Sequence, residues 1–251
     1  MGYGKVYLVG AGPGNPKLLT LRALEVLQNA DVVIYDRLVS EDVLRLIPEK
    51  AEKVYVGKAS GKHTLTQEEI NNLMIEAAVK GKTVVRLKGG DPFIFGRGGE
   101  EAEALISKNI EFEVVPGVSS AFAAPAYAGI PLTHRAYASS VAIVTGSQAA
   151  DASKKVNWGK IAGAVDTIVI LMGLESIRNI VGNLIEGGLS PDTPAAIIEW
   201  GTTENQRTII GRLAKIADEA EKASFKPPSV IVVGEVANLG RKLAWFKKPL
   251  T

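Results

Sequence analysis

The sequence predicts an α/β protein made of two α/β domains, and three observations support this. Short runs of β-branched residues alternate with longer segments of helical spacing almost from end to end, which is typical of largely parallel or mixed sheets. The alternation is interrupted near residue 117 by small apolar residues and prolines. A second alternating series then begins. We therefore expect domains over residues 1–117 and 118–251, with a ligand cleft between them.

The first domain is expected to hold five strands. They are predicted over residues 5–9, 32–35, 53–56, 83–87 and 111–115. The clearest helix is predicted over residues 67–80, where apolar residues recur at i, i+3, i+4, i+7 and i+8. Thr66 and Glu69 have the spacing of a capping box at its start, and Gly81 follows its end.

The second domain follows a segment, residues 118–131, that we interpret as a close-packed connector. Its strands are predicted over residues 141–145, 167–172, 195–199, 207–210 and 229–233. Helical patterns cover residues 177–186 and 212–222. The gap between the third and fourth of these strands is very short, so we expect a hairpin and a mixed sheet here.

Composition and charge exclude several classes of protein. The chain has no cysteine, which excludes disulfides, thiolate catalysis and cysteine-bound metal. Its two histidines, His63 and His134, are far apart, so a histidine metal site is not expected. The formal net charge of +2 gives no support to nucleic-acid binding. No targeting signal or membrane-length apolar run is present, so we expect a cytoplasmic protein that does not bind membranes.

A glycine-rich loop, residues 10–15 (GAGPGN), follows the first predicted strand. Glycines let the backbone approach a ligand closely, and the next helix offers free N–H groups. The spacing departs from the dinucleotide fingerprint, although Asp36 stands where that fingerprint expects an acid. The loop alone therefore fits either a nucleotide-type ligand or a tight turn.

A longer loop, residues 88–99 (KGGDPFIFGRGG), follows the fourth predicted strand. Ligands of α/β sheets bind at the carboxyl ends of strands, and long loops in compact domains are usually functional. Asp36 and Lys58 also come just after predicted strands. Asp36 is either a surface acid or a base in the cleft, and Lys58 is either a solvated lysine or a cleft residue.

Cations gather near these loops although the chain is nearly neutral. They are Arg37, Lys58, Lys62, His63, Arg86, Lys88 and Arg97. This asymmetry predicts an acidic small-molecule ligand, because arginine in particular can bind carboxylates with two parallel hydrogen bonds. His134 and Arg135 follow the connector and are candidates for the same cleft.

These motifs, in this order, resemble those of the tetrapyrrole methylase family, and they do so over roughly residues 5–240. The motifs that carry the resemblance are VGAGPGNPKLLT (9–20), ADVVIYDRLVS (30–40), VGK (56–58), TQEEIN (66–71), VVRLKGGDPFIFGRGGEE (84–101), VVPGVSSAFAAPAYAGIPLTHR (114–135), LMG (171–173) and EWGTT (199–203). YDRLVS and the long glycine-rich motif are specific to the branch that methylates uroporphyrinogen III.

The resemblance implies two α/β domains, a homodimer, and S-adenosyl-L-methionine bound in the cleft between the domains. The cofactor positions that it implies are Pro13, Gly89, Gly90, Asp91, Ile94, Ser119, Ser120, Met172 and Gly201. This chain departs from the usual family pattern at Ser119, Ser120 and Trp200. We expect these departures to change cofactor affinity rather than abolish binding.

The reaction implied is methyl transfer to C-2 and C-7 of uroporphyrinogen III, which gives precorrin-2 by way of precorrin-1, without a metal. Asp36, in the YDR motif, is then the candidate proton acceptor and Lys58, in the VGK motif, the candidate donor. Either residue could instead orient substrate carboxylates. Arg37, Arg97 and Arg135 are the candidate clamps for the eight carboxylates of that tetrapyrrole.

Parts of the sequence are also compatible with two other activities. A nicotinamide-dependent oxidoreductase would rest only on residues 10–14 and Asp36, and it leaves the loop at residues 88–99 unexplained. A methylase of the same fold that acts at a later step is the nearer alternative. The motifs YDRLVS and RLKGGDPFIFGRGG disfavour it. Some members of the family carry a dehydrogenase and ferrochelatase module ahead of the methylase. Because this chain begins at the GAGPG motif, we expect it to stop at precorrin-2 and to leave oxidation and metal insertion to other proteins.

Overall fold

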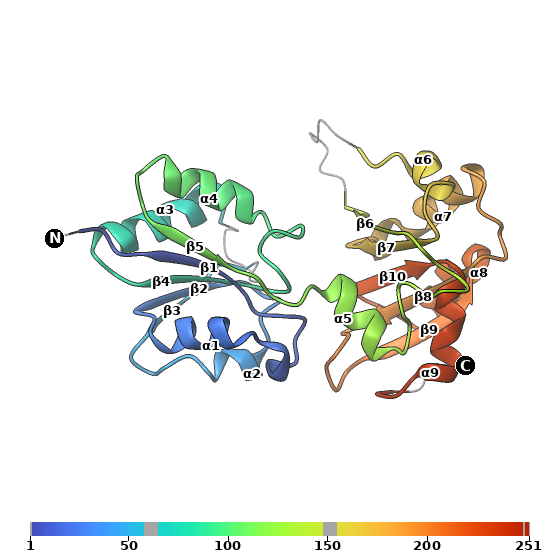
Figure 1. Ribbon diagram of the computed structural model, residues 1–251, viewed down its shortest axis with the longest axis horizontal. Helices are drawn as coiled ribbons and strands as arrows, with labels where there is room; N and C mark the ends of the chain where they lie inside the picture. The colour runs from blue at the N-terminus through green and yellow to red at the C-terminus, as the bar shows by residue number, and fades with distance from the viewer. Residues whose placement is uncertain (1, 58–64, 148–154, 248, 251) are drawn as a thin grey trace. The chain divides into compact units, whose positions relative to one another are not determined.

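The computed structural model describes residues 2–57, 65–147, 155–247 and 249–250. The chain forms two compact units, Met1–Ser119 and Ser120–Thr251 (Figure 1). The division falls two residues beyond residue 117, so Ser119 and Ser120 belong to different units. Each unit is built around one five-stranded sheet with helices on both faces. The predicted fold class, two α/β units with mainly parallel and mixed sheets, is confirmed.

The sheet of the first unit is parallel throughout, in the order β3-β2-β4-β1-β5. Its strands are β1 (Val6–Gly10), β2 (Val32–Tyr35), β3 (Glu52–Tyr55), β4 (Val84–Lys88) and β5 (Phe112–Val115). Each lies within one or two residues of a predicted strand. Their carboxyl ends therefore share one edge of the sheet, where the glycine-rich loops begin.

Among the described residues of this unit, four α-helices cover the two faces of the sheet. They are α1 (Leu21–Gln28), α2 (Glu41–Leu44), α3 (Gln67–Val79) and α4 (Gly98–Ile106), and a short 3-10 turn, η1 (Pro16–Leu18), precedes α1. Figure 1 shows α1 and α2 on one face and α3 and α4 on the other. Alternation along β4 explains the division, because Val85 and Leu87 pack with the first pair and Val84 with the second.

The start of α3 matches its sequence pattern. The backbone N–H of Glu69 donates to Thr66 Oγ1 at 3.2 Å, and the Glu69 carboxylate accepts from the backbone N–H of Thr66 at 2.6 Å. This reciprocal arrangement is the predicted capping box. It fixes the first turn of α3, the helix that packs against β4.

The second unit contains a mixed sheet in the order β6-β7-β10-β8-β9. Its strands are β6 (Val141–Thr145), β7 (Thr167–Leu171), β8 (Pro194–Glu199), β9 (Arg207–Arg212) and β10 (Ser229–Val233). Strands β6 and β7 are parallel, whereas β10 runs antiparallel to both β7 and β8. Strands β8 and β9 form an antiparallel hairpin. The predicted hairpin and mixed sheet are confirmed.

Residues 120–127, which the sequence analysis assigned to a connector, form helix α5 (Ser120–Tyr127). Its side chains are small, and Ala121 and Ala124 are buried against the second sheet. Pro125 lies inside the helix, where it lacks the N–H that a regular turn would use. The sequence pattern did not predict this helix, because its small apolar residues form no amphipathic stripe.

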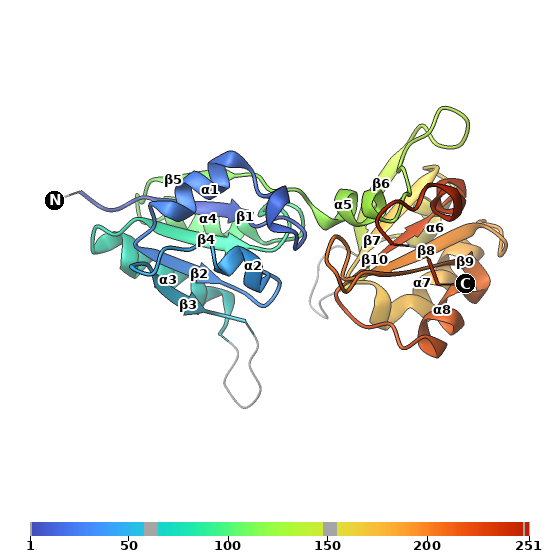
Figure 2. The same ribbon diagram turned by 90° about the horizontal axis from the view of Figure 1, so that it is seen from below.

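The remaining helices of the second unit pack on both faces of its sheet. They are α6 (Trp158–Ala162), η2 (Leu174–Ser176), α7 (Ile177–Glu186), α8 (Leu213–Lys222), η3 (Glu235–Leu239) and α9 (Gly240–Leu243). Helices α7 and α8 share one face, and α5 and η3 the other (Figure 2). Within the described residues, no helix is long and apolar enough to cross a membrane.

Candidate functional site

The chain reverses its winding at β4, and in open α/β sheets such a reversal marks the carboxyl end of the strand as the expected place for a ligand. Strands β1 and β2 lead to helices on one face of the sheet, whereas β4 leads to α4 on the other. Strand β4 lies between β2 and β1. Loops that depart in opposite directions from neighbouring parallel strands leave an opening, which is where open α/β sheets bind ligands.

Four loops meet at this edge and are joined by specific contacts. The backbones of Gly12 and Gly90 exchange two hydrogen bonds, at 3.1 and 2.7 Å. The Ser40 hydroxyl, just before α2, donates to the Gly14 carbonyl at 2.7 Å. A Cβ on Gly89 would lie 2.6 Å from Cβ of Leu38, so the loop after β2 packs directly on the glycine-rich loop. The loops that hold Pro13, Asp36 and Asp91 are therefore brought together, as the sequence predicted for strand ends.

Asp91 builds this edge through both of its carboxylate oxygens. Oδ1 accepts from the backbone N–H of Phe93 at 2.8 Å, and Oδ2 accepts from that of Gly117 at 3.0 Å. The fourth loop, residues 116–119, is thereby tied to the glycine-rich loop. Ile94 follows with 38% of its surface exposed. Phe93 and Phe95 are also exposed, and apolar side chains at such an edge suit a ligand with an apolar ring.

Asp36 is half-buried and has two partners among the described residues. Its Oδ1 accepts from the backbone N–H of Leu38 at 3.0 Å, and its Oδ2 lies 3.4 Å from Nη2 of Arg86. Arg37, next in the chain, is exposed. Lys58, Lys62 and His63 lie outside the described residues.

Arg97 is not a free cation in this structure. Its Nε and Nη2 donate to the two carboxylate oxygens of Glu100 at 3.0 and 2.6 Å. This pairing raises the pKa of Arg97 and lowers that of Glu100. The side chain is 56% exposed, so the pair is solvated and a competing carboxylate can replace Glu100.

Two of the cations that the sequence placed around the loops are buried. Arg86 and Lys88 are each 4% exposed, and both contact Glu101, which is fully buried. Burial and the neighbouring charge of Arg86 lower the pKa of Lys88, while Glu101 opposes this. The expectation that these two residues form part of an open basic cluster was therefore wrong. Glu101 was not among the residues singled out from the sequence.

In the second unit, the predicted cofactor residues Met172 and Gly201 lie at one edge of the sheet. Strands β7 and β8 point the same way, so Met172 and Gly201 both follow carboxyl ends at that edge. A Cβ on Gly201 would lie 2.4 Å from Cβ of Ala124, so α5, which begins at Ser120, packs directly beside it. Arg135 is exposed in the segment between α5 and β6.

Backbone strain marks the same edge. Met172, Trp200 and Thr202 all have positive φ, at 54°, 48° and 72°, although none is glycine. Such strain gathers at ligand sites, where the surrounding structure holds it in place. Met172 is 53% exposed, so its apolar side chain is available to a ligand. Backbone dihedrals leave no trace in the sequence pattern, so this signal was not visible there.

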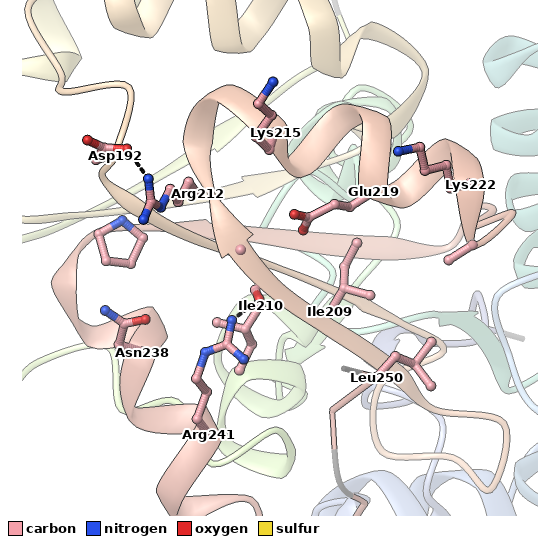
Figure 3. A pocket seen from close by; sticks show the side chains of 13 residues that line it. Asp192, Ile209, Ile210, Arg212, Lys215, Glu219, Lys222, Asn238, Arg241 and Leu250 are labelled. Atoms are coloured by element: carbon pink, nitrogen blue, oxygen red, sulfur yellow. Dashed lines mark hydrogen bonds and ion pairs between the residues drawn. The ribbon is translucent and has the colours of Figure 1, made fainter.

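A cavity of about 860 Å³ lies elsewhere in the second unit, beside the edge strand β9 and helix α8 (Figure 3). None of the predicted site residues lines it. Two of the cations that line it already have partners: Arg212 pairs with Asp192 at 3.0 Å, and Arg241 donates to the Ile210 carbonyl. The candidate site is therefore the loop edge rather than this cavity.

Comparison with known proteins decides the family. The family model described as Tetrapyrrole (Corrin/Porphyrin) Methylases matches residues 5–217. The chain belongs to the tetrapyrrole methylase family. The resemblance read from the sequence motifs is confirmed.

Individual members of the tetrapyrrole methylase family are also similar over most of the chain. A siroheme synthase of Pseudoalteromonas atlantica is 52% identical over 98% of this chain, which spans 53% of that protein's length. A uroporphyrinogen-III C-methyltransferase of Bacillus subtilis is 48% identical over 98% of this chain and 96% of its own. A crystal structure is known of a Thermus thermophilus uroporphyrin-III C-methyl transferase complexed with S-adenyl homocysteine, and its sequence is 42% identical to this chain. The two structures align with a TM-score of 0.81 over 94% of this chain and 100% of the Thermus thermophilus chain. The chain thus spans about half the length of the siroheme synthase and nearly the whole of the other two.

Proposed function

We propose that this protein methylates uroporphyrinogen III at C-2 and C-7 with S-adenosyl-L-methionine, giving precorrin-2 by way of precorrin-1. The observation that carries the proposal is the near full-length match to the Bacillus subtilis uroporphyrinogen-III C-methyltransferase. The Thermus thermophilus relative, with its bound S-adenyl homocysteine, supports the choice of cofactor. A homodimer and a cytoplasmic location are further parts of the proposal.

The cofactor would be held by residues from both units. In the first unit these are Pro13, Gly89, Gly90, Asp91, Ile94 and Ser119, and in the second they are Ser120, Met172 and Gly201. Within the first unit, the joined glycine loops and the exposed Ile94 fit a ligand with an adenosyl group and a charged amino-acid end. When bound, S-adenosyl-L-methionine supplies an electrophilic methyl group on a sulfonium.

The protein's own part in the reaction is to position the substrate and to move one proton. A pyrrole carbon is electron-rich, so the transfer depends on close, in-line placement of the two reactants. The half-buried carboxylate of Asp36 would accept the proton lost from that carbon. Arg37 and Arg97 in the first unit and Arg135 in the second would bind substrate carboxylates. Lys58 keeps its proposed role as proton donor, although it lies outside the described residues.

The direct test is an anaerobic incubation of the purified protein with uroporphyrinogen III and methyl-labelled S-adenosyl-methionine. The products would be oxidised and analysed by mass. Two added methyl groups on the macrocycle would support the proposal, and one would indicate a reaction that stops at precorrin-1. Binding of S-adenosyl-homocysteine without methyl transfer would indicate a family member with a different tetrapyrrole substrate.

A pair of substitutions separates the cofactor from the substrate. Asp91→Ala removes the acceptor of two backbone N–H groups, so we expect the Kd for S-adenosyl-homocysteine to rise by about 10- to 100-fold. Arg97→Ala should raise the KM for uroporphyrinogen III only about threefold, because Arg97 must first leave Glu100. Calorimetry and steady-state kinetics measure the two effects. Loss of cofactor binding in Arg97→Ala, with tetrapyrrole affinity intact, would contradict the roles proposed for this loop.

A further inference from the structure

Strand β4 carries two cations on the face that lies beneath α3 and α4. Arg86 and Lys88 are two residues apart, so both side chains point to the same side of the sheet as Val84. Each is 4% exposed. A buried cation is strongly disfavoured unless a carboxylate and further hydrogen bonds compensate its lost hydration.

Glu101, in the first turns of α4, provides that carboxylate. It is fully buried, and its Oε1 accepts from Nε of Arg86 at 3.0 Å, Nζ of Lys88 at 2.7 Å and Nε2 of Gln67 at 3.2 Å. Apolar residues of similar volume often stabilise a fold as well as a buried ion pair does. The cluster therefore has no obvious purpose in the fold alone.

Arg86 connects this buried cluster to the ligand edge. Its Nη1 donates to the carbonyls of Ile34 and Leu87 at 3.3 and 3.1 Å, so the guanidinium is held by the backbone of two strands. Its Nη2 contacts Oδ2 of Asp36 at 3.4 Å. Asp36 is 28% exposed, whereas Arg86 is 4% exposed and Glu101 fully buried, so Asp36 is the solvent-accessible carboxylate on this guanidinium.

We propose that Glu101 is a positioning residue for Asp36: by binding the Nε edge of Arg86, it leaves Asp36 the longer and weaker contact with that guanidinium, so that Asp36 is held in place yet remains an effective proton acceptor. This inference rests on the proposed function for its catalytic meaning. The geometry itself does not rest on the proposed function: the Arg86 guanidinium is shared between the buried Glu101 and the half-buried Asp36.

The charges around Asp36 give the sign of the expected effect. Among the described residues, the charged groups that contact it or its partner are Arg86 and Lys88 on β4 and Glu101 on α4. Glu101→Gln removes a nearby negative charge and leaves Asp36 as the remaining carboxylate partner of Arg86 in the cluster. We therefore expect the ionised form of Asp36 to be favoured in this variant.

In kinetics, we expect Glu101→Gln to lower kcat about tenfold, with little change in the KM for uroporphyrinogen III. The acid limb of the kcat profile should move to lower pH, because a less basic Asp36 remains ionised further into the acid range. Glu101→Asp, which keeps the charge, should recover part of the kcat. Affinity for S-adenosyl-homocysteine should not change.

Two further variants separate positioning from a purely structural role. Glu101→Gln combined with Lys88→Met leaves no buried lysine without its carboxylate, so thermal stability should recover. Arg86 still lacks its contact with a Glu101 carboxylate, so kcat should stay low. Glu113→Gln is the matched control, because Glu113 also binds an arginine, Arg22, at 2.8 and 2.9 Å, but on β5 at the far edge of the sheet. Its kcat should stay within twofold of the parent. Recovery of kcat together with stability in the double variant would overturn the proposal.

A measurement without substrate makes the result independent of the proposed function. The Asp36 carboxyl carbon is followed by NMR from pH 2 to 7, roughly spanning its ordinary titration range, and is assigned by comparison with Asp36→Asn. A downward shift of about half a pKa unit or more in Glu101→Gln supports the shared guanidinium. An unchanged or raised pKa overturns it. If the wild-type protein transfers no methyl group to uroporphyrinogen III, the proposed function fails, and the NMR titration still decides whether Glu101 controls Asp36.

Discussion

Asp36→Asn is expected to lower kcat for methyl transfer to uroporphyrinogen III by about 10²- to 10⁴-fold, which is the range for loss of a general base. The substitution keeps the size and shape of the side chain, and its amide oxygen can still accept from the N–H of Leu38. It cannot accept a proton. The measurement is single-turnover transfer of labelled methyl groups, with the Kd for S-adenosyl-homocysteine expected to stay unchanged.

The matched control is Asp42→Asn, which removes an exposed carboxylate on α2 that pairs with Arg45 at 2.9 Å. It should leave kcat within twofold. The kinetic pattern also distinguishes the two roles that the sequence left open for Asp36. If Asp36→Asn raises KM while kcat stays within threefold, the carboxylate orients the substrate and does not accept the proton.

The parts of the fold that were predicted are those encoded by local patterns. The ten strands are short and rich in β-branched residues, and turn residues bound most of them, so each was found within a few positions. The capping box of α3 needs only Thr66 and Glu69 at the correct spacing. Helix α5 was missed because its small side chains carry no periodic signal, and its packing against the second sheet depends on tertiary contacts.

In the candidate site, too, features encoded by local sequence patterns were predicted and those that depend on tertiary contacts were not. Loops at strand ends were found because parallel strands share a carboxyl edge, and Asp36, Gly89, Gly90 and Asp91 do lie together there. The Glu101 cluster was not found, although one signal was present: Arg86 and Lys88 occupy alternate positions of an otherwise apolar strand. That pattern indicates two cations on one buried face, but it does not identify the carboxylate that pairs with them.

Gly117→Ala is expected to weaken the whole ligand edge, because three loops approach one another there without room for a side chain. A Cβ on Gly117 would lie 2.3 Å from the Gly90 carbonyl oxygen and 2.7 Å from Cα of Gly10. Both neighbours are backbone atoms, so no side-chain rotation can relieve the overlap. The loops must move apart, and the hydrogen bond from the Gly117 N–H to Asp91 is then strained or lost.

We expect this overpacking to lower the free energy of unfolding by about 1–3 kcal/mol and to raise the Kd for S-adenosyl-homocysteine at least about tenfold. Thermal unfolding and calorimetry measure the two effects. Gly99→Ala is the matched control, because nothing lies within 4 Å of a Cβ built on Gly99 in the first turn of α4. Alanine should be neutral or slightly stabilising there, since it favours a helix more than glycine does. Equal behaviour of the two variants would mean that the three loops adjust without loss, and that close backbone approach is not what forms the ligand edge.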